Sequence, residues 1–153
     1  QMVRANGFEL PGEYYYDRKE HLWADVKGER VRVGLDMLAQ KSAGGVKHIR
    51  FKPVGTAVAK KRVFGSVEAG KYVGPLRAPV GGTILEVNQK ALENPEIVNE
   101  DPYGEGWFVV LNPSDLQGDL ADLVHGDDEV LAWLEREIAD YREKGLLREE
   151  EED

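Results

Sequence analysis

The sequence predicts a mainly β protein, a sandwich or flattened barrel of short strands that is followed by one C-terminal helix. Three observations lead to this prediction. Two early segments alternate apolar and polar residues, as half-buried strands do. Glycines then recur at short intervals through the middle of the chain, which is typical of short strands joined by tight turns. Near the end of the chain the apolar residues change to a helical period.

The first predicted element is a β-hairpin within residues 14–35. Its two segments, "HLWADV" and "RVRVGL", are joined by Lys27-Gly28-Glu29, and a short connection that contains glycine suits a hairpin turn. A short helix is expected next, near residues 36–44, because Asp36 can cap its start and a glycine can end it. The run "VKHIRF" that follows indicates another strand.

From there to residue 111 we expect turns and short strands. Glycines mark the turns at positions 55, 65, 70, 74, 81, 82, 104 and 106. A faint repeat lies within this part, since "PVGT" at 53–56 recurs as "PVGGT" at 79–83, each before a strand-like run. The interval fits two related hairpin units.

The C-terminal helix is expected near residues 128–144. Its apolar residues recur at helical spacing, acidic residues lie at its start, and Gly145 can end it: the apolar set is Val130, Leu131, Leu134, Ile138 and Tyr141. We expect residues 127–145 to pack as a helix on a domain formed by residues 1–126. Residues 146–153, an acidic tail, are expected to be disordered.

The composition restricts the class of protein. With 153 residues and 41% hydrophobic residues, the chain can bury one core. No run approaches the roughly 18 apolar residues of a membrane span. The sequence has no cysteine, which excludes disulfides and thiolate chemistry and fits a reducing cytoplasm. A net charge of −9 argues against a general nucleic-acid binder. We expect a cytoplasmic monomer that binds neither nucleic acid nor membrane.

The charges are unevenly placed along the chain. Residues 127–153 contain twelve acidic and four basic residues. Residues 47–62 contain six basic residues and no acidic one: Lys47, Arg50, Lys52, Lys60, Lys61 and Arg62. This asymmetry is compatible with electrostatic steering toward a partner, and equally with a solvated tail beside a basic loop.

Residues that could form a self-sufficient active site are not visible. His21, His48 and His125 lack the spacing of a metal site, and we interpret them as structural or exposed. No serine lies in a nucleophile elbow, and no glycine-rich phosphate loop is present. We therefore predict no catalytic residue, no metal site and no enzymatic activity of the chain by itself.

One lysine stands out because it lies in a run of turn-forming residues, "SVEAGKYVGPLRAPVGG" at 66–82. Gly70 before Lys71 and Gly74-Pro75 after it suit a tight, rigid turn. An exposed lysine at a hairpin tip can simply favour solubility. It can also be presented to an enzyme that modifies it, and an attached cofactor would then supply the chemistry that the chain lacks.

Several motifs resemble the H protein of the glycine cleavage system, a lipoyl-carrying family. The similarity runs from about residue 15 to residue 111. It includes "HLW" at 21–23, "VGLDMLAQKSAGG" from residue 33 and, most specifically, "ENPEIVNEDPYGEGW" at 93–107. Aligning the "PVGG" turn at 79–82 without a gap places Lys71 on the family's lipoylated lysine and Glu68 on the glutamate of its preceding Val-Glu.

This resemblance implies a lipoyl-domain barrel-sandwich hybrid of two small antiparallel sheets related by a pseudo-twofold axis. It implies lipoic acid as a covalent cofactor on Lys71, with Glu68, Gly70 and Gly74 as cofactor-binding neighbours. The role implied is that of a non-catalytic carrier protein. Because the reactive sulfurs come from the cofactor, the absence of cysteine is no obstacle.

The residues beside Lys71 depart from the glycine-cleavage pattern. The family's Ser and Val before the lysine and its Ser-Asp after it are absent, Gly44-Gly45 replaces its Gly-Asp, and the following strand is basic. The loop "GKYVGPLRAPVGG" is similar to the H-protein-like lipoate-binding proteins of sulfur oxidisers. The resemblance implies a carrier of sulfane sulfur in cytoplasmic sulfur oxidation.

The partners implied for that carrier are a lipoate ligase or lipoyl assembly enzymes, and the heterodisulfide-reductase-like sulfur-oxidising complex. The alternative is a glycine cleavage H protein that carries the aminomethyl group between decarboxylase, aminomethyltransferase and dihydrolipoyl dehydrogenase. A third possibility is an H-like interaction protein whose lysine stays unmodified.

Overall fold

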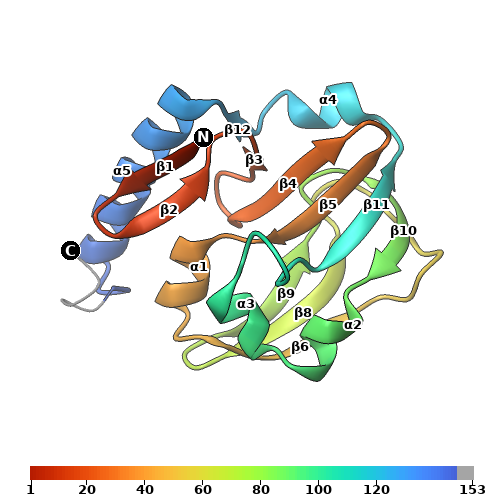
Figure 1. The fold of residues 1–153 in the computed structure, drawn as a ribbon, viewed down its shortest axis with the longest axis horizontal. Helices are drawn as coiled ribbons and strands as arrows, with labels where there is room; N and C mark the ends of the chain where they lie inside the picture. Colours follow the sequence, from red (N-terminus) through yellow and green to blue (C-terminus); the bar gives the residue numbers. More distant parts are fainter. Residues whose placement is uncertain (148–153) are drawn as a thin grey trace.

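The structure, a computed structural model, describes residues 1–147 and is mainly β. Its strands are β1 Met2–Ala5, β2 Phe8–Pro11, β3 Tyr15–Tyr16, β4 Leu22–Lys27, β5 Arg30–Leu35, β6 Val46–Phe51, β7 Ala57–Val58, β8 Val63–Ala69, β9 Val73–Arg77, β10 Gly82–Val87, β11 Val109–Pro113 and β12 Val124–His125. Its helices are α1 Met37–Ser42, α2 Gln89–Glu93, α3 Glu96–Glu100, α4 Leu116–Leu120 and α5 Asp127–Glu143 (Figure 1).

The strands form three antiparallel sheets within the described residues. A seven-stranded sheet has the order β12-β3-β4-β5-β11-β10-β7, and a three-stranded sheet has the order β6-β8-β9. The third sheet is the β1–β2 hairpin. The predicted fold class is confirmed, but the number and size of the sheets differ from the expected two small ones. The first sheet grows large because short strands from both ends of the chain extend it, and such pairing leaves no local sequence signal.

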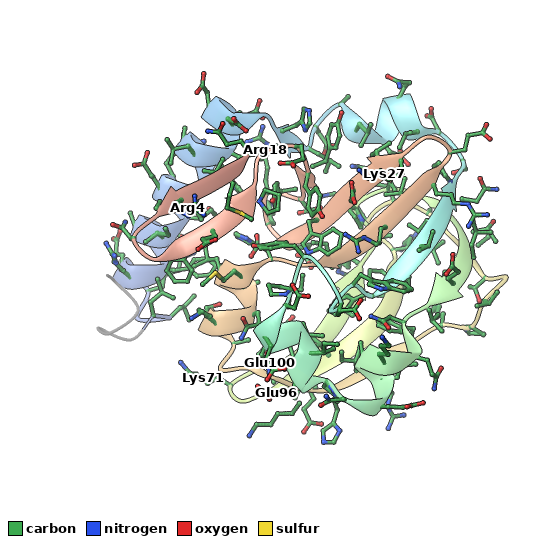
Figure 2. All side chains as sticks on the ribbon, in the orientation of Figure 1. Arg4, Arg18, Lys27, Lys71, Glu96 and Glu100 are labelled. Atoms are coloured by element: carbon green, nitrogen blue, oxygen red, sulfur yellow. The ribbon has the colours of Figure 1, made fainter. Side chains whose placement is uncertain are left out.

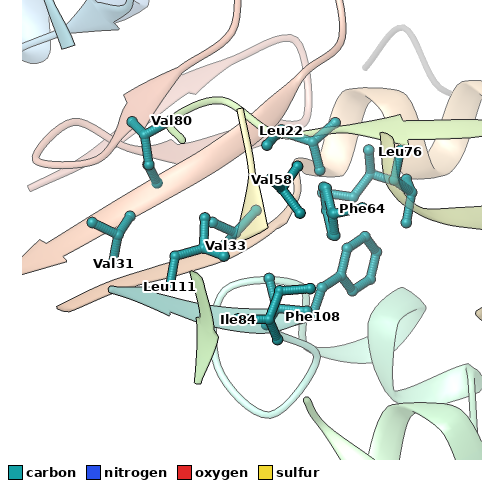
Figure 3. Packing of buried hydrophobic residues seen from close by; sticks show 14 of the residues in the cluster. Leu22, Val31, Val33, Val58, Phe64, Leu76, Val80, Ile84, Phe108 and Leu111 are labelled. Carbon is teal, nitrogen blue, oxygen red and sulfur yellow. The ribbon is translucent and has the colours of Figure 1, made fainter. Parts of the chain in front are cut away.

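The main core lies between the seven-stranded and three-stranded sheets. Alternate residues of each strand point into it, as in β5, where Val31 and Val33 are fully buried while Arg30 is exposed. Figure 3 shows these valines, with Ile84 and Leu111, facing side chains such as Phe64 and Leu76 from the other sheet: the labelled set is Leu22, Val31, Val33, Val58, Phe64, Leu76, Val80, Ile84, Phe108 and Leu111. Burial of this apolar surface is the main source of stability for the sandwich.

The predicted β4–β5 hairpin is confirmed. Lys27 pairs with Arg30 across a two-residue turn, and Gly28 takes a positive φ of 62°, which glycine adopts without strain. The predicted strand "VKHIRF" is β6. The two copies of the short repeat lie side by side, because β7 pairs with the start of β10 and the Gly55 N–H donates to the Ile84 carbonyl at 2.8 Å.

The two expected helices are present, with ends close to those predicted. The Asp36 carboxylate caps α1 by accepting a hydrogen bond from the Ala39 N–H at 2.9 Å. Helix α5 buries four residues against a second core formed with β1, β2 and the aromatic residues of β3 and β4: Val130, Trp133, Leu134 and Ile138. Most of the predicted acidic tail, residues 148–153, lies outside the described residues.

Three short helices were not predicted. α2 and α3 fall in the part that was expected to contain only turns and strands, and α4 follows β11. Each has five residues, which is too short to show a helical period. No helix among residues 1–147 is both long and apolar enough to cross a membrane.

Candidate functional site

Lys71 lies at the tip of the β8–β9 hairpin. The turn consists of Gly70 and Lys71, and it is closed by a hydrogen bond of 2.7 Å from the Ala69 N–H to the Tyr72 carbonyl. The Lys71 side chain is exposed, and its ammonium group has no hydrogen bond or ion pair within the described part of the chain. The hairpin therefore presents a primary amine to solvent.

The backbone of this tip is fixed by the loop that follows α1. The Lys71 N–H donates to the Ala43 carbonyl at 2.8 Å, and the Gly70 N–H donates to the Gly45 carbonyl at 3.1 Å. Gly44 and Gly45 have φ values of 88° and 90°, a region that favours glycine. A β-carbon on Gly70 would lie 2.8 Å from the Gly44 carbonyl oxygen, so the close approach requires glycine at this position. The tip thus combines a fixed backbone with a free side chain.

The structure separates the other three residues predicted to bind the cofactor. Gly70 lies in the turn, as described above. Gly74 is not part of the turn, contrary to the prediction: it lies in β9 and pairs with Val67, because the strand resumes two residues after Lys71. Glu68 is exposed, whereas its neighbours in β8 are buried, so it lies on the outer face of the sheet.

A cavity of about 340 Å³ adjoins Lys71. Apolar side chains from β4, β5, α1, β6, β8 and β9 form most of its wall, and Tyr141 and Leu146 border it beside the end of α5: the apolar lining is Leu22, Leu35, Ala39, Ala43, Val46, Val67, Ala69, Pro75 and Leu76. Lys71 and Tyr72 also line this space. An uncharged chain attached to Lys71 has apolar surface within reach.

Asn99 of α3 holds the start of β6 in place. Its side-chain oxygen accepts a hydrogen bond from the Val46 N–H at 2.8 Å, and its amide donates to the Val46 carbonyl at 3.1 Å. These bonds fix the residue next to Gly45, and so support the loop on which the Lys71 turn rests. Sequence reasoning missed this residue, although Asn99 lies within the motif "ENPEIVNEDPYGEGW".

His21 joins the elements around the cavity. Its ring is fully buried, with Nδ1 2.6 Å from Asp36 and Nε2 2.7 Å from Glu137 of α5. The ring stacks on Trp133 with 4.7 Å between centroids. Burial by itself lowers the pKa of His21, but the two carboxylates outweigh this and raise it to about 9. A charged imidazolium therefore links α5 to the residue that caps α1.

The other histidines have ordinary surroundings. His125 stacks on Tyr15 at 3.8 Å, and His48 is exposed on β6. No group of three or more histidine or acidic side chains suited to a metal ion occurs among residues 1–147. The chemical feature of this region is accordingly the accessible Lys71 amine, which can form an amide with a carboxylic acid.

Comparison with known proteins gives one family. The sequence pattern described as "Glycine cleavage H-protein" matches residues 14–135. "Glycine cleavage system H protein 2" of Aquifex aeolicus is 40% identical over 135 residues, covering 86% of this chain and 84% of the relative. The "Glycine cleavage system H protein" of Geobacillus thermodenitrificans is 44% identical over 106 residues, covering 69% of this chain and 83% of the relative.

A solved structure agrees with these relatives. The crystal structure of a glycine cleavage system H protein from Mycobacterium marinum superposes with a TM-score of 0.70 and 31% identity. The match covers 79% of this chain and 96% of that one. Both the sequence and the fold thus resemble the same group of proteins.

Proposed function

Because the chain belongs to the glycine cleavage H-protein family, whose members carry lipoate covalently on a lysine, we propose that Lys71 is its lipoylated residue. Proteins of this family are lipoyl carriers rather than catalysts. The position of Lys71 supports the proposal, since its backbone is held by Ala43 and its amine is unpaired in the described structure. An attaching enzyme can then recognise a fixed loop and reach a free nucleophile.

The residues around Lys71 fit a lipoyl group. When bound, this group supplies a dithiolane whose disulfide can open and close, a chemistry that a chain without cysteine cannot provide. Lys71 would hold it through an amide. The apolar wall formed by residues such as Leu35, Val67 and Leu76 can shelter a hydrocarbon arm from water between transfers.

We further propose that the chain carries an aminomethyl group among the enzymes of the glycine cleavage system. The observation that carries this proposal is the match over residues 14–135 to proteins named for that system. Its partners would be the decarboxylase, the aminomethyltransferase and dihydrolipoyl dehydrogenase. This function was the alternative at the level of sequence, and the relatives favour it over sulfur transfer.

Sulfur transfer remains the second candidate because of one local observation. Gly44-Gly45 stands where the family pattern has Gly-Asp, and the backbone of this loop contacts the Lys71 turn directly. The aminomethyl amine would meet no carboxylate from this loop, whereas a sulfane sulfur needs none. Two of the relatives are H proteins numbered 2 and 3 from one organism, Aquifex aeolicus. A cell with several copies can assign one of them to a second pathway.

Two measurements test these proposals in turn. The intact mass of the chain from the cells that make it should show a lipoyl group, which Lys71→Arg removes. Lys27→Arg serves as the matched control, since Lys27 is an exposed lysine at the end of the β4–β5 hairpin. An unmodified native chain would exclude both carrier roles. Turnover of the lipoylated chain by glycine decarboxylase and aminomethyltransferase then decides between them, because failure to react would exclude the aminomethyl role.

A further inference from the structure

The basic segment of residues 47–62 divides into two groups in the structure. Lys60 and Lys61 form ion pairs within the chain, since the Lys60 ammonium lies 2.9 Å from Asp122 and Lys61 pairs with the buried Asp17. The other four basic side chains are exposed and form no ion pair within the described residues: Lys47, Arg50, Lys52 and Arg62. Uncompensated cations are unexpected in a chain with a net charge of −9.

Strand β6 places most of these cations beside the Lys71 hairpin. The β6-β8-β9 sheet turns the paired residues Ile49 and Val67 into the core, and the residues on either side of them in each strand face outward. Arg50 lies opposite Ser66, which lies opposite Pro75, so the outer surface runs from β6 across to β9. Lys47 and Lys52 flank it along the edge strand. We name this outer surface of β6, β8 and β9 the basic face.

The same face carries exposed apolar surface next to Lys71. Val73, two residues from the lysine, is 74% exposed, the largest value among the large apolar side chains of residues 1–147. It lies in one row with Glu68 and His48, and Pro75 beside it is also exposed. The face thus combines exposed apolar side chains on β9 with cations on β6, and exposed apolar surface beside charged residues is typical of a protein-binding surface.

The charge of the face indicates what it binds. Glu68 is the acidic residue among the outward positions of the basic face. Three cations outnumber it: Lys47 and Arg50 of β6, and Lys52 directly after β6. So few cations on an acidic protein are a poor footprint for a polyanion such as nucleic acid, which needs many phosphate contacts. A protein surface with a few carboxylates matches both the charge and the exposed apolar residue.

We propose that the basic face is the docking surface for the enzyme that acts on the Lys71 arm, and that this enzyme presents carboxylates to Arg50 and Lys52. The proposal rests on the proposed function in that Lys71 must carry an arm which a partner reaches. Docking here places the partner beside the turn. Most of the cavity wall lies on the other side of the sheet, where Val67, Ala69 and Leu76 line the cavity, and Pro75 is the residue of the basic face that also borders it.

The test compares two double charge reversals with the same change in net charge. Arg50→Glu/Lys52→Glu alters the basic face. Arg4→Glu/Arg136→Glu is the control, since Arg4 on β1 and Arg136 on α5 are exposed on elements that pack on the second core and lie outside the basic face. Figure 2 shows Arg4 on β1, apart from Lys71. Lipoylated chains are offered to glycine decarboxylase at low and high salt. The proposal expects the basic-face variant to raise the apparent KM about tenfold at low salt with kcat unchanged, and high salt to abolish the difference.

Other results would overturn the proposal. Equal effects of the two variants would show a general charge effect, and no effect of either would show that docking occurs elsewhere. The chain could instead bind RNA or anionic phosphatidylglycerol vesicles, and only the basic-face variant could lose this binding while its turnover stays unchanged. That result would assign the face to a polyanion.

The proposed function can fail separately. If glycine decarboxylase does not accept the lipoylated chain without substitutions, the aminomethyl role is excluded. The same two variants are then assayed with the sulfur-oxidising complex of the second candidate as the partner enzyme. The expected difference in apparent KM between the basic-face variant and the control is the same as with glycine decarboxylase. A lipoylated chain that neither system accepts overturns the docking proposal as well.

Discussion

The buried link between His21 and α5 gives a strong prediction about stability. His21→Asn is the suitable change, because His21 has a φ of 63° and asparagine tolerates this left-handed conformation better than most residues. The change removes the imidazolium from between Asp36 and Glu137 while leaving the backbone able to keep its course. The carboxylate of Asp36, which is also buried, then loses its charged partner.

The expected loss follows from this geometry. Removing one partner of a buried ion pair costs about 3–5 kcal/mol, because the remaining charge stays desolvated. For a domain of this size the melting temperature should fall by roughly 6–20 °C. The effect should reach the Lys71 turn, since Asp36 caps α1 and the loop after α1 accepts the Lys71 N–H.

Urea unfolding monitored by tryptophan fluorescence measures the loss of stability. His125→Asn provides the control, because His125 is exposed and its ring only stacks on Tyr15 and contacts a carbonyl. Amide hydrogen exchange at Gly70 and Lys71 reports whether the turn loosens. A loss below about 1 kcal/mol for His21→Asn, similar to that of a surface substitution, would refute the reasoning.

The same link predicts how stability depends on pH. The pKa of His21 is raised from 6.5 to about 9 in the folded chain, so the folded state keeps a proton that the unfolded chain releases. The resulting stabilisation is complete below pH 6.5 and disappears as the pH rises through about 9. The interval corresponds to about 3 kcal/mol. His21→Asn should remove this fall between pH 7 and 9.5, and a fall that persists in the variant would assign it to other groups.

Two further predictions concern the residues that support the turn. Gly70→Val should lower the rate of lipoylation at least about tenfold, because its β-carbon would meet the Gly44 carbonyl. Gly74→Val should stay within about twofold, because the atoms nearest to its β-carbon belong to the movable Tyr72 phenol. Equal rates for the two variants would show that the ligase does not recognise the turn. Asn99→Ala should reduce the free energy of unfolding by about 1–3 kcal/mol, since it leaves the N–H and carbonyl of buried Val46 without the Asn99 side chain. Asn99→Asp should not recover this loss, because it keeps the acceptor for the Val46 N–H but sets a carboxylate oxygen against the Val46 carbonyl and the Glu96 carboxylate, to which the amide donates. Urea unfolding of the three chains measures this, and equal stability would contradict the role of Asn99.

The sequence predicts those parts of the fold whose signals are local. The β4–β5 hairpin follows from alternation on both sides of Gly28, and α1 follows from the Asp36 cap. One local signal was overlooked: Asn6-Gly7 joins β1 to β2, with φ values of 50° and 86°, and this dipeptide is a strong indicator of a hairpin. The size of the main sheet could not be predicted, because β12 pairs with β3 across more than one hundred residues.

The site also contains one part that the sequence predicts, Lys71, and one part that it does not, the contacts that support Lys71. Lys71 could be located because Gly70 marks the turn locally, although Gly74 and Pro75, which the sequence also assigned to the turn, lie in β9. Its supports come from elsewhere, since the Lys71 N–H bonds to Ala43, Asn99 bonds to Val46, and His21 contacts Glu137. A carrier needs this arrangement, because a lysine on an unsupported hairpin would present its arm in many orientations. Contacts from residues distant in the sequence fix the backbone of the turn while the Lys71 side chain stays free. A single sequence reveals the lysine, but it does not reveal these long-range contacts.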